Sequence, residues 1–165
     1  MPQFSRALFT VFLITGAVLI ATTTGRLPPQ VASHFGAAGT PNGWMDRGAY
    51  LAFMLGFAVA MPLAVVLPLS VLSRRHVDRI NLPHRDYWLA PPRREATLRY
   101  LGAHACLLGA LLVALVVGVH FTLLEANAAQ PPRLPGPLFG TLVALFPVAM
   151  AAWVLTLVLH FRRKG

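Results

Sequence analysis

Long apolar segments alternate with short polar ones along the whole chain. Four segments are almost free of charged residues over the length that crosses a bilayer, namely 7–24, 49–72, 100–124 and 138–161. A helix rises ~1.5 Å per residue, so ~20 apolar residues span the ~30 Å hydrocarbon core. The pattern therefore predicts four transmembrane helices.

Three polar connections separate these segments. Residues 25–48 are rich in Pro and Gly, residues 73–99 are rich in Arg, and the third connection is short and proline-rich. We expect the third to be a stiff, extended link. At 165 residues, the chain is predicted to form a single membrane domain, 1–165. Its expected class is all-α: a polytopic four-helix transmembrane bundle with a structured extracytoplasmic loop.

The composition supports a membrane protein. It is 56% hydrophobic and 12% charged, which is more apolar than a soluble domain of this size can bury. A net charge of +9 on a soluble surface would indicate nucleic acid. Here the basic residues lie between apolar runs, so we expect the lipid bilayer as a partner and no nucleic acid.

The first apolar segment follows Arg6 and has two interpretations, a signal peptide or a retained helix. Its uncharged length exceeds the ~7–15-residue core of a secretory signal, and no small-x-small cleavage site stands at 21–25. We expect a retained helix. Cleavage would change the number of helices but not the orientation of the rest.

Basic residues are distributed unevenly over the connections. The first and third connections hold three of them, Arg26, Arg47 and Arg133. The other eleven of the 14 Lys and Arg residues lie in the two terminal tails and in 73–99. Because Lys and Arg are retained on the cytoplasmic side, both termini and residues 73–99 are predicted to be cytoplasmic, with residues 25–48 outside.

Prolines and histidines interrupt the apolar segments. We expect structural kinks at Pro62, Pro68 and Pro147, which lack a backbone donor. For His104 an interhelical hydrogen bond is the favoured interpretation, with a proton or ligand site as the alternative. His120 lies close to the predicted outer boundary, so we expect it to be solvated or beside lipid headgroups.

The basic inner loop, 73–99, has two interpretations. Its Tyr87–Trp88 pair suits an aromatic anchor at the headgroup layer, and its arginines attract anionic lipid. A loop that lies on the bilayer and sets the topology is the simpler interpretation. The alternative is a docking surface for a cytoplasmic protein, with Asn81, Asp86, Tyr87 and Trp88 as candidate contacts.

The outer loop, 25–48, carries the candidate ligand or partner residues. Its TPNG tetrapeptide at 40–43 predicts a turn, because Pro presets φ while Asn and Gly accept left-handed geometry. That turn would bring the residues after it back toward those before it. The candidates are His34, Phe35, Asn42, Trp44, Asp46 and Arg47.

Catalytic and metal chemistry are weakly supported in this loop. One histidine together with Asp46 makes a poor zinc set. A nucleophilic arrangement of Ser33, His34 and Asp46 can be written, but adjacent Ser and His side chains seldom face each other and nothing supplies an oxyanion hole. We therefore predict no catalytic residue, no metal and no cofactor.

A family signature can be recognised in the same loop. The pattern Leu-Pro, aliphatic, His-Phe, Gly-x-Pro-x-Gly-Trp falls on Leu27, Pro28, Val31, His34, Phe35, Gly39, Pro41, Gly43 and Trp44. It resembles the signature of the bacterial membrane family called domain of unknown function 1648. The stretch NLPHRDYWLAP, 81–91, is similar to a second segment of many short members. The resemblance implies a location in the bacterial cytoplasmic (inner) membrane.

This chain departs from the family pattern at two positions. Members often carry Asn after the His-Phe pair and Lys near the end of the loop, where this chain has Gly36 and Arg47. A distantly similar member is the longer immunity protein that protects sporulating cells from their own killing peptide and is thought to sequester a transcriptional repressor. The resemblance implies fold and location more firmly than activity.

We expect a non-enzymatic integral membrane protein. Its outer loop would recognise an envelope ligand or partner (peptide, lipid or protein), and its inner loop would report or stabilise the resulting state. A cytoplasmic protein is a candidate partner of the inner loop. A small oligomeric transporter or channel subunit is the alternative, suggested by the prolines and His104. A membrane enzyme is the third possibility.

Overall fold

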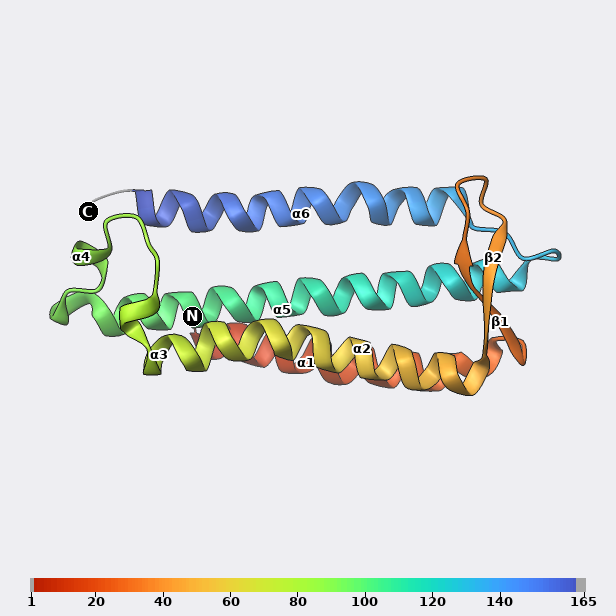
Figure 1. Cartoon of the computed structure of the whole chain (residues 1–165), viewed down its shortest axis with the longest axis horizontal. Helices are drawn as coiled ribbons and strands as arrows, with labels where there is room; N and C mark the ends of the chain where they lie inside the picture. The colour runs from red at the N-terminus through yellow and green to blue at the C-terminus, as the bar shows by residue number, and fades with distance from the viewer. Residues whose placement is uncertain (1, 163–165) are drawn as a thin grey trace.

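Four long helices run side by side along the molecule (Figure 1). The structure is a computed structural model that describes residues 2–162, the side chains of residues 2, 72 and 73 excepted. The helices are α1 (Pro2–Thr23), α2 (Arg47–Leu67), α5 (Pro91–Ala128) and α6 (Gly136–Arg162). Each is long and apolar enough to cross a membrane, which supports a multi-pass membrane protein.

The inner connection is more helical and shorter than predicted. Helix α5 has 38 residues and begins at Pro91 rather than near residue 100, because prolines in its first turn are preorganised for a helix. Before it come the π-helix η2 (Pro68–Leu72) and the short helices α3 (Ser73–Arg75), η3 (Val77–Arg79) and α4 (Arg85–Trp88). Pro62 and Pro147 stay inside α2 and α6, whereas Pro68 opens the π-helix, because it cannot donate to the α-helical ladder.

The helices pack in two groups. Helices α1 and α2 lie on one side of α5, and α6 lies on the other (Figure 1). The core between α1, α2 and α5 includes Ile20, Tyr50, Met54 and Val116. A second buried cluster in the same helices contains Phe9 of α1, Val66 of α2 and Cys106 of α5. In contrast, Phe161 is the one buried residue of α6.

The connection between α1 and α2 contains a β-hairpin. The chain is therefore mostly but not purely α-helical, whereas an all-α class was predicted. The 3-10 helix η1 (Thr24–Arg26) leads to strand β1 (Gln30–Phe35), which pairs antiparallel with β2 (Pro41–Asp46). The turn spans residues 36–40 rather than the predicted 40–43. The Gly36 N–H donates to the Thr40 carbonyl, and Gly39 has a φ of +73°, which favours glycine. Pro41 instead opens an edge strand, where its missing donor is tolerated.

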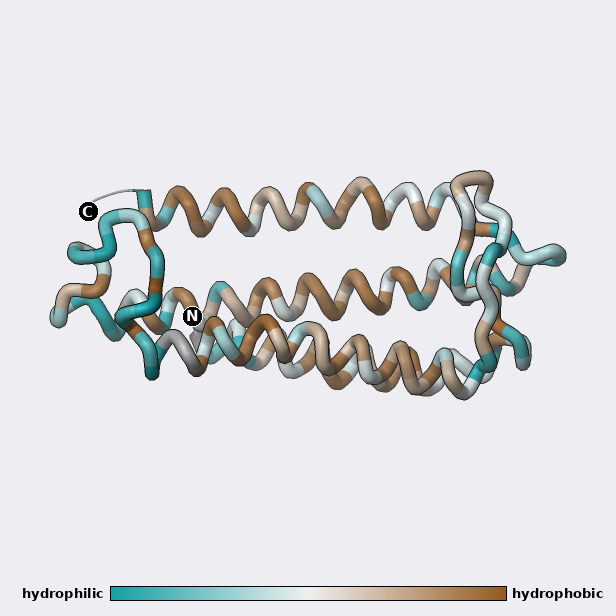
Figure 2. The backbone as a smooth tube through the Cα atoms, in the orientation of Figure 1, coloured by the Kyte–Doolittle hydropathy of each residue, from teal (hydrophilic) through white to brown (hydrophobic). Residues whose placement is uncertain are grey.

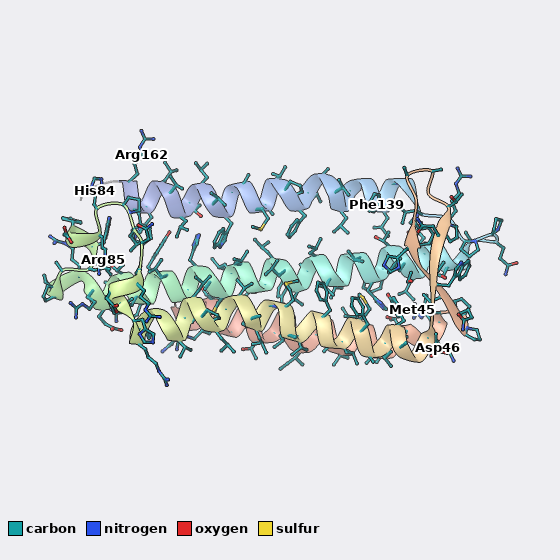
Figure 3. The ribbon with its side chains drawn as sticks, viewed as in Figure 1. Met45, Asp46, His84, Arg85, Phe139 and Arg162 are labelled. Atoms are coloured by element: carbon teal, nitrogen blue, oxygen red, sulfur yellow. The ribbon has the colours of Figure 1, made fainter. Side chains whose placement is uncertain are left out.

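Polar residues gather at the two ends of the bundle, and apolar residues fill the length between them (Figure 2). We call the end with β1 and β2 the hairpin end, and the end with α3, α4 and the start of α5 the arginine end. Met45 and Asp46 lie at the hairpin end, whereas His84, Arg85 and Arg162 lie at the arginine end (Figure 3). Arg163 and Lys164, which contribute to the predicted charge asymmetry, lie outside the described residues.

Candidate functional site

The hairpin is fixed to the bundle by one side chain of α5. The Asn127 Oδ1 accepts from the Ala32 N–H at 2.8 Å, and its Nδ2 donates to the Ala32 carbonyl at 3.0 Å. Nδ2 also donates to the Leu123 carbonyl at 2.8 Å, which orients the amide. Val31 and Ala32 are fully buried. Strand β1 is therefore held on the bundle by a two-point bond and by burial.

Two of the predicted site residues join the hairpin to α2. The Asp46 carboxylate accepts from the backbone N–H groups of Gly48 and Ala49 at 2.7 and 3.3 Å, so Asp46 is the N-cap of α2. Arg47 donates from Nη1 to the Leu27 carbonyl at 2.9 Å and from its backbone to the Pro29 carbonyl at 2.9 Å. Both side chains thus have a structural role that the sequence analysis missed.

Three other predicted residues are exposed on the two strands of the hairpin. His34, Asn42 and Trp44 are exposed, and 53% of the Trp44 surface is accessible. In the register, Trp44 faces Ala32 and Gly43 faces His34. A Cβ atom at position 43 would lie 3.0 Å from the Cβ of His34, so glycine makes room for the imidazole. Phe35 is half-buried and packs against the core instead.

The nucleophilic arrangement of Ser33, His34 and Asp46 does not assemble. Contrary to expectation, the adjacent side chains do meet, with 3.0 Å between Ser33 Oγ and His34 Nδ1. However, Asp46 pairs in register with Gln30 at the far end of the strands, and its carboxylate caps α2. Among residues 2–162 no group of three or more His, Cys, Asp or Glu side chains is placed to hold a metal ion.

Beneath the hairpin lies a buried polar cluster that links three helices. His120 of α5 is 0% exposed, with Nε2 at 2.7 Å from Thr23 Oγ1 and Nδ1 at 2.8 Å from the Tyr50 hydroxyl. The Thr23 hydroxyl donates its single proton to the Leu19 carbonyl at 2.6 Å. It must therefore accept from His120 Nε2–H, which leaves Nδ1 to accept from Tyr50. The prediction that His120 is solvated or beside headgroups is wrong.

The sequence carried a signal for this burial. His120 lies four residues after Val116 and seven after Val113, and both valines are buried. On a helix these positions share one face, so the histidine follows the core stripe of α5. The distance of His120 from the helix end suggested exposure, whereas its position on the helix face indicates burial.

His104 joins α5 to α6 as predicted. Its Nε2–H donates to the Trp153 carbonyl at 3.0 Å, and the Trp153 indole N–H donates back to the His104 carbonyl at 3.0 Å. The two rings stack with centroids 4.7 Å apart. The expected interhelical hydrogen bond is therefore confirmed.

The four candidate residues of the basic loop have different surroundings. The Trp88 indole N–H donates to the Phe161 carbonyl at 3.2 Å, and its ring stacks on His160, so it locks α4 to the end of α6. Tyr87 lies under the Arg93 guanidinium, 3.9 Å from the ring centroid. Asn81 lines a cavity described below, and Asp86 is exposed on α4. The headgroup anchor predicted for the aromatic pair stays a prediction.

Part of the chain matches a known family. Residues 11–59 match the family described as Domain of unknown function (DUF1648). The DUF1648 segment runs from Val11 through η1 and the hairpin to Val59 of α2, so it contains all six candidate residues of the outer loop. No curated protein and no solved structure matches the chain. The expected likeness to the immunity protein stays a prediction.

Proposed function

We propose that this is a multi-pass protein of the bacterial cytoplasmic membrane that binds a ligand or partner outside the membrane through exposed side chains of its hairpin. We use the term recognition face for three exposed side chains of the two strands, His34, Asn42 and Trp44. The observation that carries the proposal is Trp44, which is 53% exposed on a strand pair that is otherwise tied firmly to the bundle.

An anchored hairpin suits recognition for an energetic reason. Binding surfaces lose affinity when their loops must be ordered on binding, and a preformed surface avoids that cost. Tryptophan is among the residues that contribute most at interfaces, because its large ring buries much surface with few rotatable bonds. The Asn127 bonds and the α2 cap hold the strands in place before any partner arrives.

The alternative functions have less support from the contacts. A transporter was suggested by His104, but its ring bonds and stacks on Trp153 in the contact between α5 and α6. An enzyme would need an acid beside the Ser33–His34 pair, and the Asp46 carboxylate is engaged at the α2 cap. We therefore favour binding over transport or catalysis.

The orientation proposed here follows from charge. The three basic residues at the hairpin end are Arg26, Arg47 and Arg133, whereas the sequence places the other eleven in the two termini and in residues 73–99, which we propose to be cytoplasmic. In a Cys106→Ala background, Asn42→Cys is expected to react with an impermeant thiol reagent in intact spheroplasts. Asp86→Cys is expected to react only after permeabilisation. The opposite pattern would invert the topology and remove the proposal.

Photo-crosslinking from position 44 in living cells tests the recognition face itself. A photoreactive amino acid at position 44 is expected to capture a defined adduct, and His34→Ala in the same chain should reduce it at unchanged protein level. The matched control places the same group at Gln130, which is exposed at the same end but off the recognition face. Identical adducts from both positions, or no effect of His34→Ala, would contradict specific recognition.

A further inference from the structure

A cavity of about 540 Å³ opens at the arginine end, between α5, α6, the π-helix η2 and the segment that follows it. Its walls are apolar and include Leu69, Leu82, Leu101 and Leu157. Its rim carries His76 and Arg79. Small-molecule sites commonly measure ~300–1,000 Å³ and combine apolar walls with a few polar groups. The cavity has a volume in that range, apolar walls and polar residues at its rim.

The sequence explains why space remains here. Pro68 ends the α-helical ladder of α2 and opens the π-helix, and Pro68 and Leu69 both line the cavity. On the opposite wall, Trp153 and Leu157 come from α6, the helix that is buried only at Phe161. His104 and Trp153, which bond to each other, also line the cavity.

Arg79 is the rim residue available to bind an anion. Three other arginines of this end are engaged elsewhere: Arg74 pairs with Glu95 at 3.2 Å, Arg85 donates to backbone carbonyls, and Arg93 covers Tyr87. Within the described part of the chain, the Arg79 guanidinium has neither a hydrogen bond nor an ion pair. It is exposed at the mouth of an apolar cavity, where it can bind a phosphate while a hydrocarbon chain lies inside.

We infer that this cavity binds one acyl chain of an anionic phospholipid, with the phosphate held at Arg79. Moving an acyl chain from the bilayer into an apolar groove changes its free energy little, because lipid tails are as apolar as leucine. Selectivity must therefore come from the headgroup, which favours a lipid with net negative charge over a zwitterionic one. The site lies at the opposite end from the recognition face and does not depend on its function.

Native mass spectrometry of the detergent-purified protein tests this site. It would be titrated with dioleoyl phosphatidylglycerol, dioleoyl phosphatidylcholine and inorganic phosphate. We expect the protein to retain phosphatidylglycerol in preference to phosphatidylcholine. Arg79→Gln should lower that affinity about fivefold, from the ~1 kcal/mol each arginine contributes to anionic lipid. The affinity for phosphatidylcholine should fall less, because the choline cation offsets the charge of its phosphate. Arg99→Gln is the matched control, since Arg99 is exposed at the same end but does not line the cavity.

A second pair of variants tests the apolar part. Leu157→Trp adds bulk to the cavity wall and should weaken binding of both lipids, whereas Leu159→Trp, on the exposed side of the same helix, should not. Equal losses in the two arginine variants would show diffuse attraction and overturn the site. So would equal retention of the two lipids, saturation by inorganic phosphate alone, or a dimer mass in which a second copy replaces the lipid.

Discussion

Replacing His120 by alanine is expected to lower the free energy of unfolding by about 3 kcal/mol, through a cavity at a buried site and two lost hydrogen bonds. The imidazole is completely buried between α1, α2 and α5, and it bonds Thr23 and Tyr50. Removal leaves the Tyr50 hydroxyl without its acceptor in an apolar setting. Unfolding in mixed micelles with increasing dodecyl sulfate, followed by circular dichroism, measures the change.

Three variants separate this cluster from a general effect of losing histidine. His34→Ala removes the same side chain from an exposed position and should change stability by less than about 0.5 kcal/mol. Tyr50→Phe should cost about 1 kcal/mol, because it removes one hydroxyl and little volume. The double variant His120→Ala/Tyr50→Phe should lose less stability than the sum of its two single variants, since each of these removes the bond between His120 and Tyr50. Equal effects of His120→Ala and His34→Ala would contradict a stabilising cluster.

The helices were predictable because each has one dominant signal. A membrane-length run without charge leaves the backbone no alternative to a helix, so the four apolar segments were found from length alone. Their ends were not. Helix α5 begins at Pro91, among polar residues that the hydrophobic pattern does not mark. Proline in the first turn was the local signal that decided the boundary.

The hairpin shows where local rules stop. Two turn signals stand next to each other, Gly36–Gly39 and the TPNG tetrapeptide, and each can turn the chain. The choice between them follows from β1, whose Val31 is buried and whose Ala32 is bonded to Asn127, 95 residues away in sequence. Because a one-residue shift would exchange the two faces of the strand, this distant anchor fixes the register and hence the turn. No local pattern contains that information.

The candidate site illustrates the same limit for individual side chains. Asp46 was predicted as a ligand contact, yet it precedes α2 directly and is a favoured N-cap residue, so its structural role was readable from the sequence. The exposure of Trp44 was not readable, because a tryptophan beside a transmembrane helix fits a buried face equally well. The hairpin register decides it, since Trp44 alternates with the half-buried Met45.

The second large effect is expected where α1, α2 and α5 approach one another at Gly109. A Cβ atom there would lie 2.5 Å from Cγ2 of Val66 and 2.7 Å from Cε2 of Phe9, so any larger side chain must displace these side chains or the helices that carry them. Gly109→Ala is expected to destabilise by about 2 kcal/mol and Gly109→Leu by more than about 3 kcal/mol, through overpacking of a filled interface. The same micelle titration provides the measurement.

Gly102 is the matched control, because it lies two turns earlier on the same helix and nothing lies within 4 Å of the position its Cβ would occupy. Gly102→Ala should be neutral or should stabilise by up to about 1 kcal/mol, since alanine is the better helix former. Helix propensity favours alanine at both positions, so the difference between the two variants isolates the packing of α5 against α1 and α2. A Gly109→Ala protein as stable as the Gly102→Ala one would show that these helices do not meet as described. The anchor for the hairpin would then be lost as well, because Asn127 and His120 are held in place by the same helix.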